Sequence, residues 1–333
     1  MFKVLIVTYY CTNNYGSFLQ AWALGEFFKK KGCKVVYWGS KDLENQNKIN
    51  QNNTYRVERD KCLLKAQREF FCIDYECKEK YDLIVVGSDV IWASTKIKAF
   101  WGRGLHGKKI ISYAASIWGM ADASNIPVKI RKTIEKIRLF SEYIQLKKFS
   151  GISVRDSRTE KSIKGIVGKK TDVSKVLDPT FLMENIPEIE RLILEKYVLV
   201  YSYALVGEDI NPVIEYAKRH QCKICVIGYK AVWADYNLAV SPFELLSLFK
   251  YSEAVFTTTF HGTALSIING CNFVTFNSNK GRQLLEEFEL DGRMVDSDSA
   301  LEVIEQKIDY DQVNLIIKNK KNLSIQYLEK FIP

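Results

Sequence analysis

The chain has 333 residues, of which 47% are hydrophobic and 26% charged, and its formal net charge is +9. This length and composition exclude a disulfide-stapled miniprotein, a collagen-like chain and a disordered protein, and they favour about two globular domains. No apolar run approaches the ~18 residues of a membrane-spanning helix, and the N-terminus lacks the features of an export signal. We therefore expect a cytoplasmic protein whose cysteines are reduced.

Positive charge is dispersed along the chain, and no zinc-finger, RNP or basic-zipper pattern is present. Nucleic acid is therefore not an expected partner, whereas an anionic substrate or an anionic membrane surface suits the net charge. The lysine runs at 29–31 and 147–148 predict a peripheral contact with the inner membrane surface. The alternative for both runs is an ordinary solvated helix face.

Short β-branched segments alternate with amphipathic segments of helical length along the chain. This alternation is typical of βαβ units and parallel sheets, so the predicted fold class is α/β. We predict strands at 2–8, 34–38, 83–87, 109–114, 151–155, 174–178, 197–203, 222–228, 253–258 and 272–276. We predict helices at 18–31, 128–148, 158–165, 210–220, 242–251, 262–270, 281–288 and 311–330.

Ser17 with Gln20 predicts a capping box for the first helix, and Gly32 predicts its end. A second capping box is predicted at Ser157 and Glu160. Residues 43–80 interrupt the alternation, so we expect an insertion with a polar loop followed by a charged helix.

A linker near Pro187 precedes a fresh strand, which predicts a boundary between two domains. The expected domains are an N-terminal Rossmann-like domain at 1–190, a second one at 191–310, and a C-terminal helix at 311–333 that packs back on the body. Such domains would face one another across a cleft, with ligands at the carboxyl ends of the strands.

Two motifs resemble known sites but stand in the wrong context. Gly102 to Gly107 matches GxGxxG, yet a loop precedes it and a strand follows, so no dinucleotide is expected there and His106 is read as a loop residue. Cys222 and Cys225 have CxxC spacing, but no second pair accompanies them and they fall in a predicted strand. No metal site is therefore expected.

Polar residues cluster where predicted strands of the first half end. They are Asn14 to Ser17, Ser88 with Asp89, Ser112 to Ser116, and Arg155 with Asp156. Each position alone also suits a turn or a helix cap. Because the carboxyl ends of parallel strands share one edge of a sheet, together they predict a binding site.

The second half contains a histidine at a strand-to-helix junction, His261, directly before Gly262 and Thr263. The N–H groups of a helix start, with a histidine and a hydroxyl, favour a phosphate or carboxylate. Lys280 and Arg282 lie at the next such junction, where either could neutralise a phosphate.

With these residues in view, the sequence resembles the polysaccharide pyruvyl transferase family. The resemblance covers roughly residues 3–295, and its six motifs occur in the family's order. They are Asn14 to Leu24 (NYGSFLQAWAL), Gly87 to Trp92 (GSDVIW), Ser112 to Ser116 (SYAAS), Ile152 to Asp156 (ISVRD), Leu177 to Leu182 (LDPTFL) and Thr259 to Thr263 (TFHGT).

The resemblance implies a two-domain fold similar to GT-B glycosyltransferases. It also implies phosphoenolpyruvate as donor, a sugar of a cell-surface polysaccharide precursor as acceptor, and a pyruvate ketal and phosphate as products. No metal or other cofactor is implied, and the acceptor is expected to be lipid-linked. The chain departs from the family where Thr257 to Thr259 replace the common Thr-Asp pair, which puts a carboxylate base in that motif in doubt.

Site roles follow from the resemblance and from the chemistry of ketal formation, which needs one acid and one base. The expected catalytic residues are His261, Arg155, Asp89 and Asp178. The expected donor-binding residues are Arg155, His261, Gly262, Thr263 and Lys280 or Arg282. The expected acceptor-binding residues are Asn14, Tyr15, Gly16, Ser17, Ser88, Asp89, Ser112 and Trp233. Loops within 41–80 and 229–241 are expected to set the acceptor's identity.

Three alternatives remain open on the residues alone. A nucleotide-sugar glycosyltransferase uses the same double Rossmann architecture. A non-catalytic sugar-binding relative would retain the scaffold without phosphate release. An oxidoreductase is the third, disfavoured by the misplaced GxGxxG.

Overall fold

A computed structural model describes residues 1–11, 13–44, 54–77, 79–93, 97–117, 133, 142, 144–168, 171–276 and 279–333, without the side chains of 42, 44, 279 and 280. The predicted helix at 128–148 lies for the most part outside the described residues. None of the described helices combines the length and the apolarity that a bilayer span requires.

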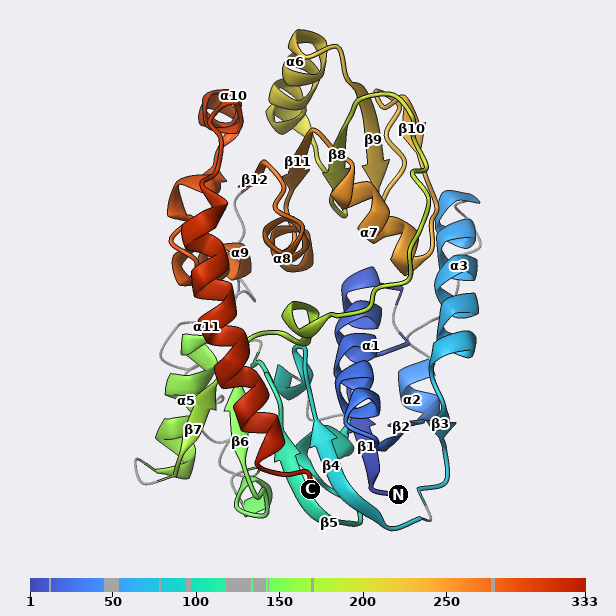
Figure 1. Cartoon of the computed structure of the whole chain (residues 1–333), viewed down its shortest axis with the longest axis vertical. Coiled ribbons are helices and arrows are strands. Elements are labelled where there is room, and N and C mark those ends of the chain that lie inside the picture. The colour runs from blue at the N-terminus through green and yellow to red at the C-terminus, as the bar shows by residue number, and fades with distance from the viewer. Residues whose placement is uncertain are drawn as a thin grey trace. The chain divides into compact units, whose positions relative to one another are not determined.

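The chain divides into two compact units (Figure 1). Unit 1 comprises Met1–Asn47, Gln67–Met183 and Lys320–Pro333, and unit 2 comprises Lys48–Ala66 and Glu184–Asn319. Part of the predicted insertion therefore belongs to unit 2, although it lies within the range expected for the first domain. The end of the predicted C-terminal helix belongs to unit 1.

Unit 1 contains a parallel sheet whose strand order reverses at β1. The order is β3-β2-β1-β4-β5, and a parallel pair of β6 and β7 joins the β5 side through bridges from Ile111 to Gly151 and from Ala115 to Val154. The strands are β1 (Lys3–Val7), β2 (Lys34–Trp38), β3 (Ile73–Asp74), β4 (Tyr81–Val86), β5 (Gly107–Ser112), β6 (Ile152–Val154) and β7 (Val173–Lys175). Among the elements whose backbone the structure describes in full, the helices wholly inside this unit are α1 (Tyr15–Lys30), α2 (Lys41–Glu44), α5 (Ser157–Val167) and the short 3-10 turns η2 (Ile91–Ala93), η3 (Lys98–Trp101) and η5 (Pro179–Leu182).

Unit 2 repeats this plan with an all-parallel sheet in the order β10-β9-β8-β11-β12-β13. Its strands are β8 (Tyr197–Tyr201), β9 (Lys223–Ile227), β10 (Tyr236–Asn237), β11 (Ala254–Thr257), β12 (Phe273–Phe276) and β13 (Met294–Val295). Its helices are α6 (Asn211–Arg219), α7 (Pro242–Lys250), α8 (Phe260–Ile268), α9 (Asn279–Glu287), α10 (Ser297–Glu305) and the 3-10 turns η6 (Gly207–Ile210) and η7 (Asp291–Arg293). Two helices begin in unit 2 and end in unit 1, namely α3 (Thr54–Phe70) and α11 (Tyr310–Glu329).

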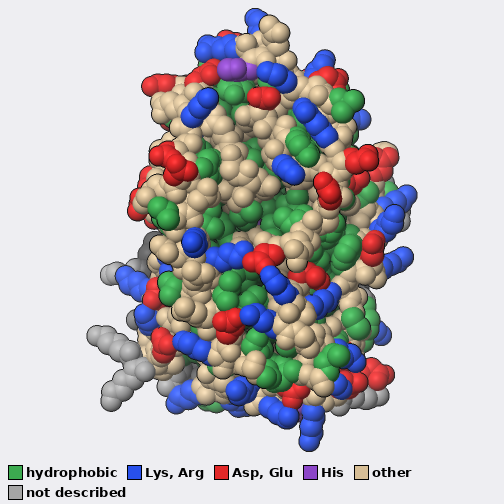
Figure 2. Space-filling model, in the orientation of Figure 1, with side chains coloured by type: hydrophobic (Ala, Val, Ile, Leu, Met, Phe, Trp, Pro, Cys, Tyr) green, Lys and Arg blue, Asp and Glu red, His purple; other side chains and the backbone are tan. Residues whose placement is uncertain are grey.

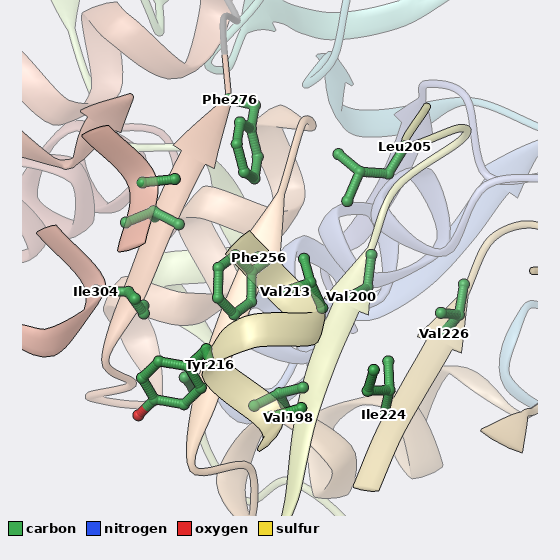
Figure 3. Close-up of a cluster of buried hydrophobic side chains, with 14 of the residues drawn as sticks. Val198, Val200, Leu205, Val213, Tyr216, Ile224, Val226, Phe256, Phe276 and Ile304 are labelled. Carbon is green, nitrogen blue, oxygen red and sulfur yellow. The ribbon is translucent and has the colours of Figure 1, made fainter. Parts of the chain in front are cut away.

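The central strands are buried on both faces, as the apolar runs in their sequences predict. All five residues of β8 are buried, and so are all four of β11. On one face of this sheet, Val200, Phe256 and Phe276 pack with Tyr216 from α6 and Ile304 from α10 (Figure 3). This core fixes the strand ends on which the candidate site depends.

The predicted strands are confirmed with small shifts at their ends, but the predicted starts of two helices are wrong. Helix α1 is capped by Asn14, whose side chain accepts from the N–H of Gly16, rather than by Ser17. Helix α5 is capped by Asp156, whose side chain accepts from the N–H of Thr159. Ser17 lies in the first turn of α1, and Ser157 is the first residue of α5. Asn and Asp cap a helix as well as serine does, and Asn14 and Asp156 stand before these serines in the chain.

The interpretation of the GxGxxG stretch is confirmed, whereas several short elements were not predicted. Gly102 adopts a left-handed conformation at the end of η3 and β5 begins at Gly107, so the GxGxxG stretch has no helix after it, as expected. Helix α10 and the two-residue strands β3, β10 and β13 are not among the predicted elements. Strands of two residues are too short to show a periodic pattern.

The end of α11 packs on unit 1 through two buried hydrogen bonds. Ser324 Oγ accepts from the N–H of Leu177 at 2.9 Å, and the hydroxyl of Tyr327 donates to the carbonyl of Ser112 at 2.9 Å. These contacts anchor the C-terminal helix on the strands of this unit.

The charge on the surface is mixed, as the sequence predicts. Lys and Arg side chains are interspersed with Asp and Glu on the face in Figure 2. Within the predicted membrane-facing run, Lys29 is ion-paired with Glu26 and Lys31 with Glu329. These pairs are features of an ordinary solvated helix end, and a membrane contact stays a prediction.

Candidate functional site

In unit 1 the strand order reverses between β1 and β4, and ligands of open parallel sheets bind at such a point, beyond the carboxyl ends of the strands. The residues that follow these two strands, together with those after β5 and β6, carry the polar side chains predicted from the sequence. We call this set of strand ends the charged edge and build it from its central residue.

Arg155 occupies the centre of the charged edge, directly after β6, and its side chain is 6% exposed. Its Nη1 donates to Asp178 Oδ2 at 2.8 Å, and its Nη2 lies 3.7 Å from Asp89 Oδ1. Burial alone lowers the pKa of this guanidinium, but the two carboxylates outweigh burial and raise it. Arg155 is therefore a fixed positive charge between two predicted catalytic carboxylates.

The two carboxylates have different surroundings. Asp178 has a side chain 1% exposed, and its Oδ1 accepts from both the N–H and the hydroxyl of Thr180. Its Oδ2 accepts from Ser88 Oγ at 3.2 Å as well as from Arg155. Asp178 is thus engaged at both oxygens by structural partners.

Asp89 is more accessible than Asp178, with 13% of its side chain exposed. Its Oδ2 accepts from Ser17 Oγ at 2.9 Å and its Oδ1 from the N–H of Val90 at 2.7 Å. Its backbone has a φ of +77°, a left-handed conformation that aspartate adopts more readily than bulkier side chains. Of the two carboxylates, Asp89 is the one that a ligand could approach.

Residues next to Asp89 complete the edge, and the sequence analysis did not single out all of them. Gln20 Nε2 donates to Thr8 Oγ1 and to the carbonyls of Tyr9 and Ser17, which ties the end of β1 to the start of α1. Burial and the nearby Asp89 carboxylate raise the pKa of the Tyr9 phenol. Thr8 and Tyr9 directly follow β1, so the rule of strand ends would have identified them.

Several predicted acceptor-binding residues have structural contacts here. Ser112 is fully buried, and its hydroxyl donates to the carbonyl of Ser153 and accepts from the N–H of the same residue, which links β5 to β6. Tyr15 is buried in α1, and Asn14 is the N-cap of that helix. Ser17, Ser88 and Asp89 are the predicted residues that the structure brings together with Arg155 and Asp178.

The equivalent strand ends of unit 2 carry hydroxyls in place of charges, and we call them the hydroxyl edge. Ser202 after β8 and Thr258 after β11 are hydrogen-bonded through their hydroxyls at 2.7 Å. Thr257 Oγ1 donates to the carbonyl of Tyr201, and it accepts from the N–H of Thr259. This edge lies at the reversal of strand order in unit 2, between β8 and β11.

His261 lies in the first turn of α8, beside the hydroxyl edge, and is 7% exposed. The N-cap is Thr259, whose hydroxyl accepts from the N–H of Gly262 and whose carbonyl accepts from the N–H of Thr263. The two N–H groups predicted to bind an anion are therefore already hydrogen-bonded within the cap. A Cβ at Gly262 would lie 2.0 Å from Thr257 Oγ1, so the helix start approaches β11 as closely as glycine permits.

The remaining predicted site residues of unit 2 are spread out. Arg282 is exposed on α9, and the side chain of Lys280 lies outside the described residues. Trp233 is half-buried and packs against the apolar cluster of Figure 3, which favours the packing interpretation over a sugar platform. Cys225 is buried in β9, where desolvation raises its thiol pKa to about 12. No group of three potential metal ligands occurs among the described residues.

Comparisons with known proteins show the family and the fold of the chain. The sequence pattern of the polysaccharide pyruvyl transferase family matches residues 14–280. No curated protein matches the chain.

Solved structures show the likeness of fold. The UDP-GlcNAc 2-epimerase of Methanocaldococcus jannaschii in complex with UDP-GlcNAc and UDP superposes with a TM-score of 0.51 at 10% identity, over 96% of this chain and 98% of that one. The Neisseria meningitidis enzyme bound to UDP-GlcNAc gives 0.52 at 9% identity, over 98% and 100%. The S. aureus MnaA–UDP structure gives 0.55 at 12% identity, over 100% and 98%. The predicted α/β class with two Rossmann-like units of the GT-B type is confirmed.

Proposed function

Because the chain belongs to the polysaccharide pyruvyl transferase family, we propose that it transfers pyruvate from phosphoenolpyruvate to a sugar of a cell-surface polysaccharide precursor. The products are a pyruvate ketal and inorganic phosphate. The observation that carries this proposal is the charged edge, where an accessible carboxylate lies beside a buried Arg155 at the carboxyl ends of a parallel sheet.

The reaction sets the requirements for the site. The methylene carbon of phosphoenolpyruvate gains a proton, and one sugar hydroxyl attacks the adjacent carbon and loses its proton. A second hydroxyl then attacks the same carbon, loses its proton and displaces phosphate, which closes the ketal. The enzyme must therefore supply a base for the hydroxyls and a group that binds or protonates the leaving phosphate.

Asp89 is the base in this proposal. A base must lie within hydrogen-bond reach of the proton that it removes, and Asp89 is the more accessible carboxylate of the charged edge. Ser17 and Arg155 orient it, while Asp178 holds Arg155. Arg155 has a positioning role through these contacts, and its predicted contact with the donor stays a prediction.

His261 is the donor-binding residue of unit 2 in this proposal. The side chain of His261, the start of α8 and the hydroxyls of Ser202 and Thr258 would together complement a phosphate. No metal or other cofactor enters this chemistry. A lipid-linked acceptor, a cytoplasmic site of action and a peripheral membrane contact are parts of the same proposal.

Calorimetric titration with phosphoenolpyruvate tests the donor assignment. We expect wild type to bind and His261→Ala to lose binding, with the Asn269→Ala variant at the other end of α8 as the matched control. Weaker binding by Arg155→Ala would support the predicted contact of Arg155 with the donor. Arg155→Lys tests whether the planar guanidinium is needed or a positive charge is enough. Uridine diphosphate binding without phosphoenolpyruvate binding would favour a nucleotide-sugar glycosyltransferase instead.

Phosphate release with an acceptor sugar tests the base. Asp89→Asn should lower kcat by at least about 100-fold with little change in the affinity for phosphoenolpyruvate, because general-base catalysis contributes about 10²–10⁴-fold. Thr180→Val, which disturbs Asp178 without touching Asp89, is the control. An Asp89→Asn variant that turns over at the wild-type rate would remove Asp89 from the mechanism.

A further inference from the structure

The first half of α3 belongs to unit 2, although unit 1 surrounds it in the sequence. Tyr55 donates its hydroxyl proton to the carbonyl of Leu238 and accepts from the N–H of Gly228 at 2.7 Å. Farther along the helix, Cys62 Sγ contacts the carbonyl of Ala239. These contacts join α3 to residues 238–239 after β10, so parts of the two segments predicted to set the acceptor lie against each other.

Arg59 lies one helical turn after Tyr55 and contacts the same peptide. Its Nη1 donates to the carbonyl of Gly228 at 3.4 Å, while Tyr55 binds the N–H of that glycine. Gly228 follows the last residue of β9 and has a φ of +109°. A Cβ there would lie 2.0 Å from the carbonyl oxygen of Ser202, so this peptide adjoins the hydroxyl edge.

The guanidinium of Arg59 is almost entirely enclosed, with 10% of the side chain exposed. Its Nε and Nη2 donate to Asp60 Oδ1 at 3.0 and 2.7 Å. A guanidinium has five N–H donors. Within the described part of the chain, the contacts of Nε, Nη2 and Nη1 engage three of them, one on each nitrogen. A buried arginine thus retains donor capacity at the carboxyl end of β9.

We propose that Arg59 is an anion-binding residue of unit 2, which donates to a phosphate or carboxylate of a ligand seated at the hydroxyl edge. The inference rests on the proposed function, because it assigns this anion to phosphoenolpyruvate. Adjacent strands lie about 4.8 Å apart, so the ends of β9, β8 and β11 span about 10 Å. One small ligand at Ser202 and Thr258 is therefore within reach of the Arg59 side chain.

A purely structural role explains less of this arrangement. Tyr55 and Cys62 already attach α3 to unit 2, and both do so without a charge. A buried ion pair commonly contributes no more stability than apolar residues of the same size. Asp60 instead holds the guanidinium in one orientation, as a binding residue requires.

The test compares paired variants by calorimetric titration with phosphoenolpyruvate and with inorganic pyrophosphate. Arg59→Met with Asp60→Leu replaces both members of the buried ion pair with apolar side chains, so this double variant is expected to fold. Arg56→Met removes the same charge from an exposed position of the same helix and is the matched control. Circular dichroism and thermal unfolding verify the fold of each variant.

We expect the double variant to bind phosphoenolpyruvate about 10–100-fold more weakly, because hydrogen bonds to charged groups have this magnitude. The Arg56→Met variant should bind as wild type does. Equal affinity of wild type and the folded double variant for both anions would overturn the inference while leaving the proposed function intact.

Titration with pyrophosphate distinguishes failure of the Arg59 inference from failure of the phosphoenolpyruvate assignment. If wild type binds pyrophosphate but not phosphoenolpyruvate, and the double variant loses that binding, Arg59 binds a diphosphate and the donor assignment is wrong. If wild type binds neither anion, the inference and the donor assignment both fail.

Discussion

The two units share one strand plan, yet their carboxyl edges differ in chemistry. The charged edge of unit 1 has Arg155 between two carboxylates, whereas the hydroxyl edge of unit 2 has the Ser202–Thr258 pair and the start of α8. Both edges place a glycine at a strand end against a neighbouring carbonyl. The comparison teaches that the scaffold determines where side chains gather, and that the residue types at the strand ends determine the chemistry.

The largest loss of stability is expected from a substitution in the charged edge. Asp178→Asn removes the carboxylate that accepts from buried Arg155 at 2.8 Å, so we expect a loss of about 3–5 kcal/mol in the free energy of unfolding. Urea unfolding measures the loss, and hydrogen exchange should place it in β4 to β6. The unit 2 counterpart Thr258→Val should lose only about 1 kcal/mol. Similar losses from both variants would contradict the contrast between the edges.

Alanine at the two strand-end glycines tests what the edges share. A Cβ at Gly87 would lie 2.2 Å from the carbonyl oxygen of Tyr113, and one at Gly228 lies equally close to Ser202. Both glycines also have positive φ, so each Gly→Ala variant should lose about 2–4 kcal/mol through overpacking and strain. Thermal unfolding measures this loss. Gly292→Ala is the control, because no atom lies within 4 Å of the position that its Cβ would take, and an equal loss there would refute the steric reason.

Tyr55→Phe tests the hydrogen bond between α3 and the end of β9 in unit 2. It leaves the N–H of Gly228 without its phenol partner, so we expect a loss of about 1–3 kcal/mol near neutral pH. Burial raises the pKa of Tyr55 to about 12 from its ordinary value near 10. The folded state therefore favours the protonated phenol, and its contribution is complete below pH 10 and declines as the pH rises toward 12.

Alkaline unfolding measures this part of the pH dependence. The difference in free energy of unfolding between wild type and Tyr55→Phe should shrink between pH 10 and 12. A difference that stays constant over this range would contradict the assigned pKa.

The smallest effect concerns the packing of α8 on the sheet. Thr263 Oγ1 and Thr275 Oγ1 are 2.9 Å apart and buried. Thr263→Val removes one hydroxyl, so we expect a loss of about 1 kcal/mol and unchanged phosphoenolpyruvate binding. Unfolding and titration on the same preparation measure both. A variant that loses binding would move Thr263 from helix packing into the ligand site, as the sequence analysis expected.

Particular residues show where sequence patterns succeeded and where they failed. Asp89 and Arg155 were recognisable because Asp89 lies in the turn after β4 and Arg155 directly follows β6, and parallel strands bring such positions to one edge. The pairing of Arg155 with Asp178 was not readable, because 22 intervening residues separate them and the contact exists only after β6 and η5 are packed. Ser112 also lies at the end of a strand, but its hydroxyl is hydrogen-bonded to the backbone of Ser153 in β6.

Local sequence patterns predict the α/β class, the positions of most long strands and helices, and the strand ends at which polar residues gather. These follow from local periodicity and from the short range of turn and capping interactions. Three facts follow from tertiary packing instead: residues 54–66 belong to unit 2, Arg59 contacts Gly228, and Asp178 is more deeply buried than Asp89. These facts depend on contacts between segments distant in the chain, which packing of the complete sheets creates and no local pattern encodes.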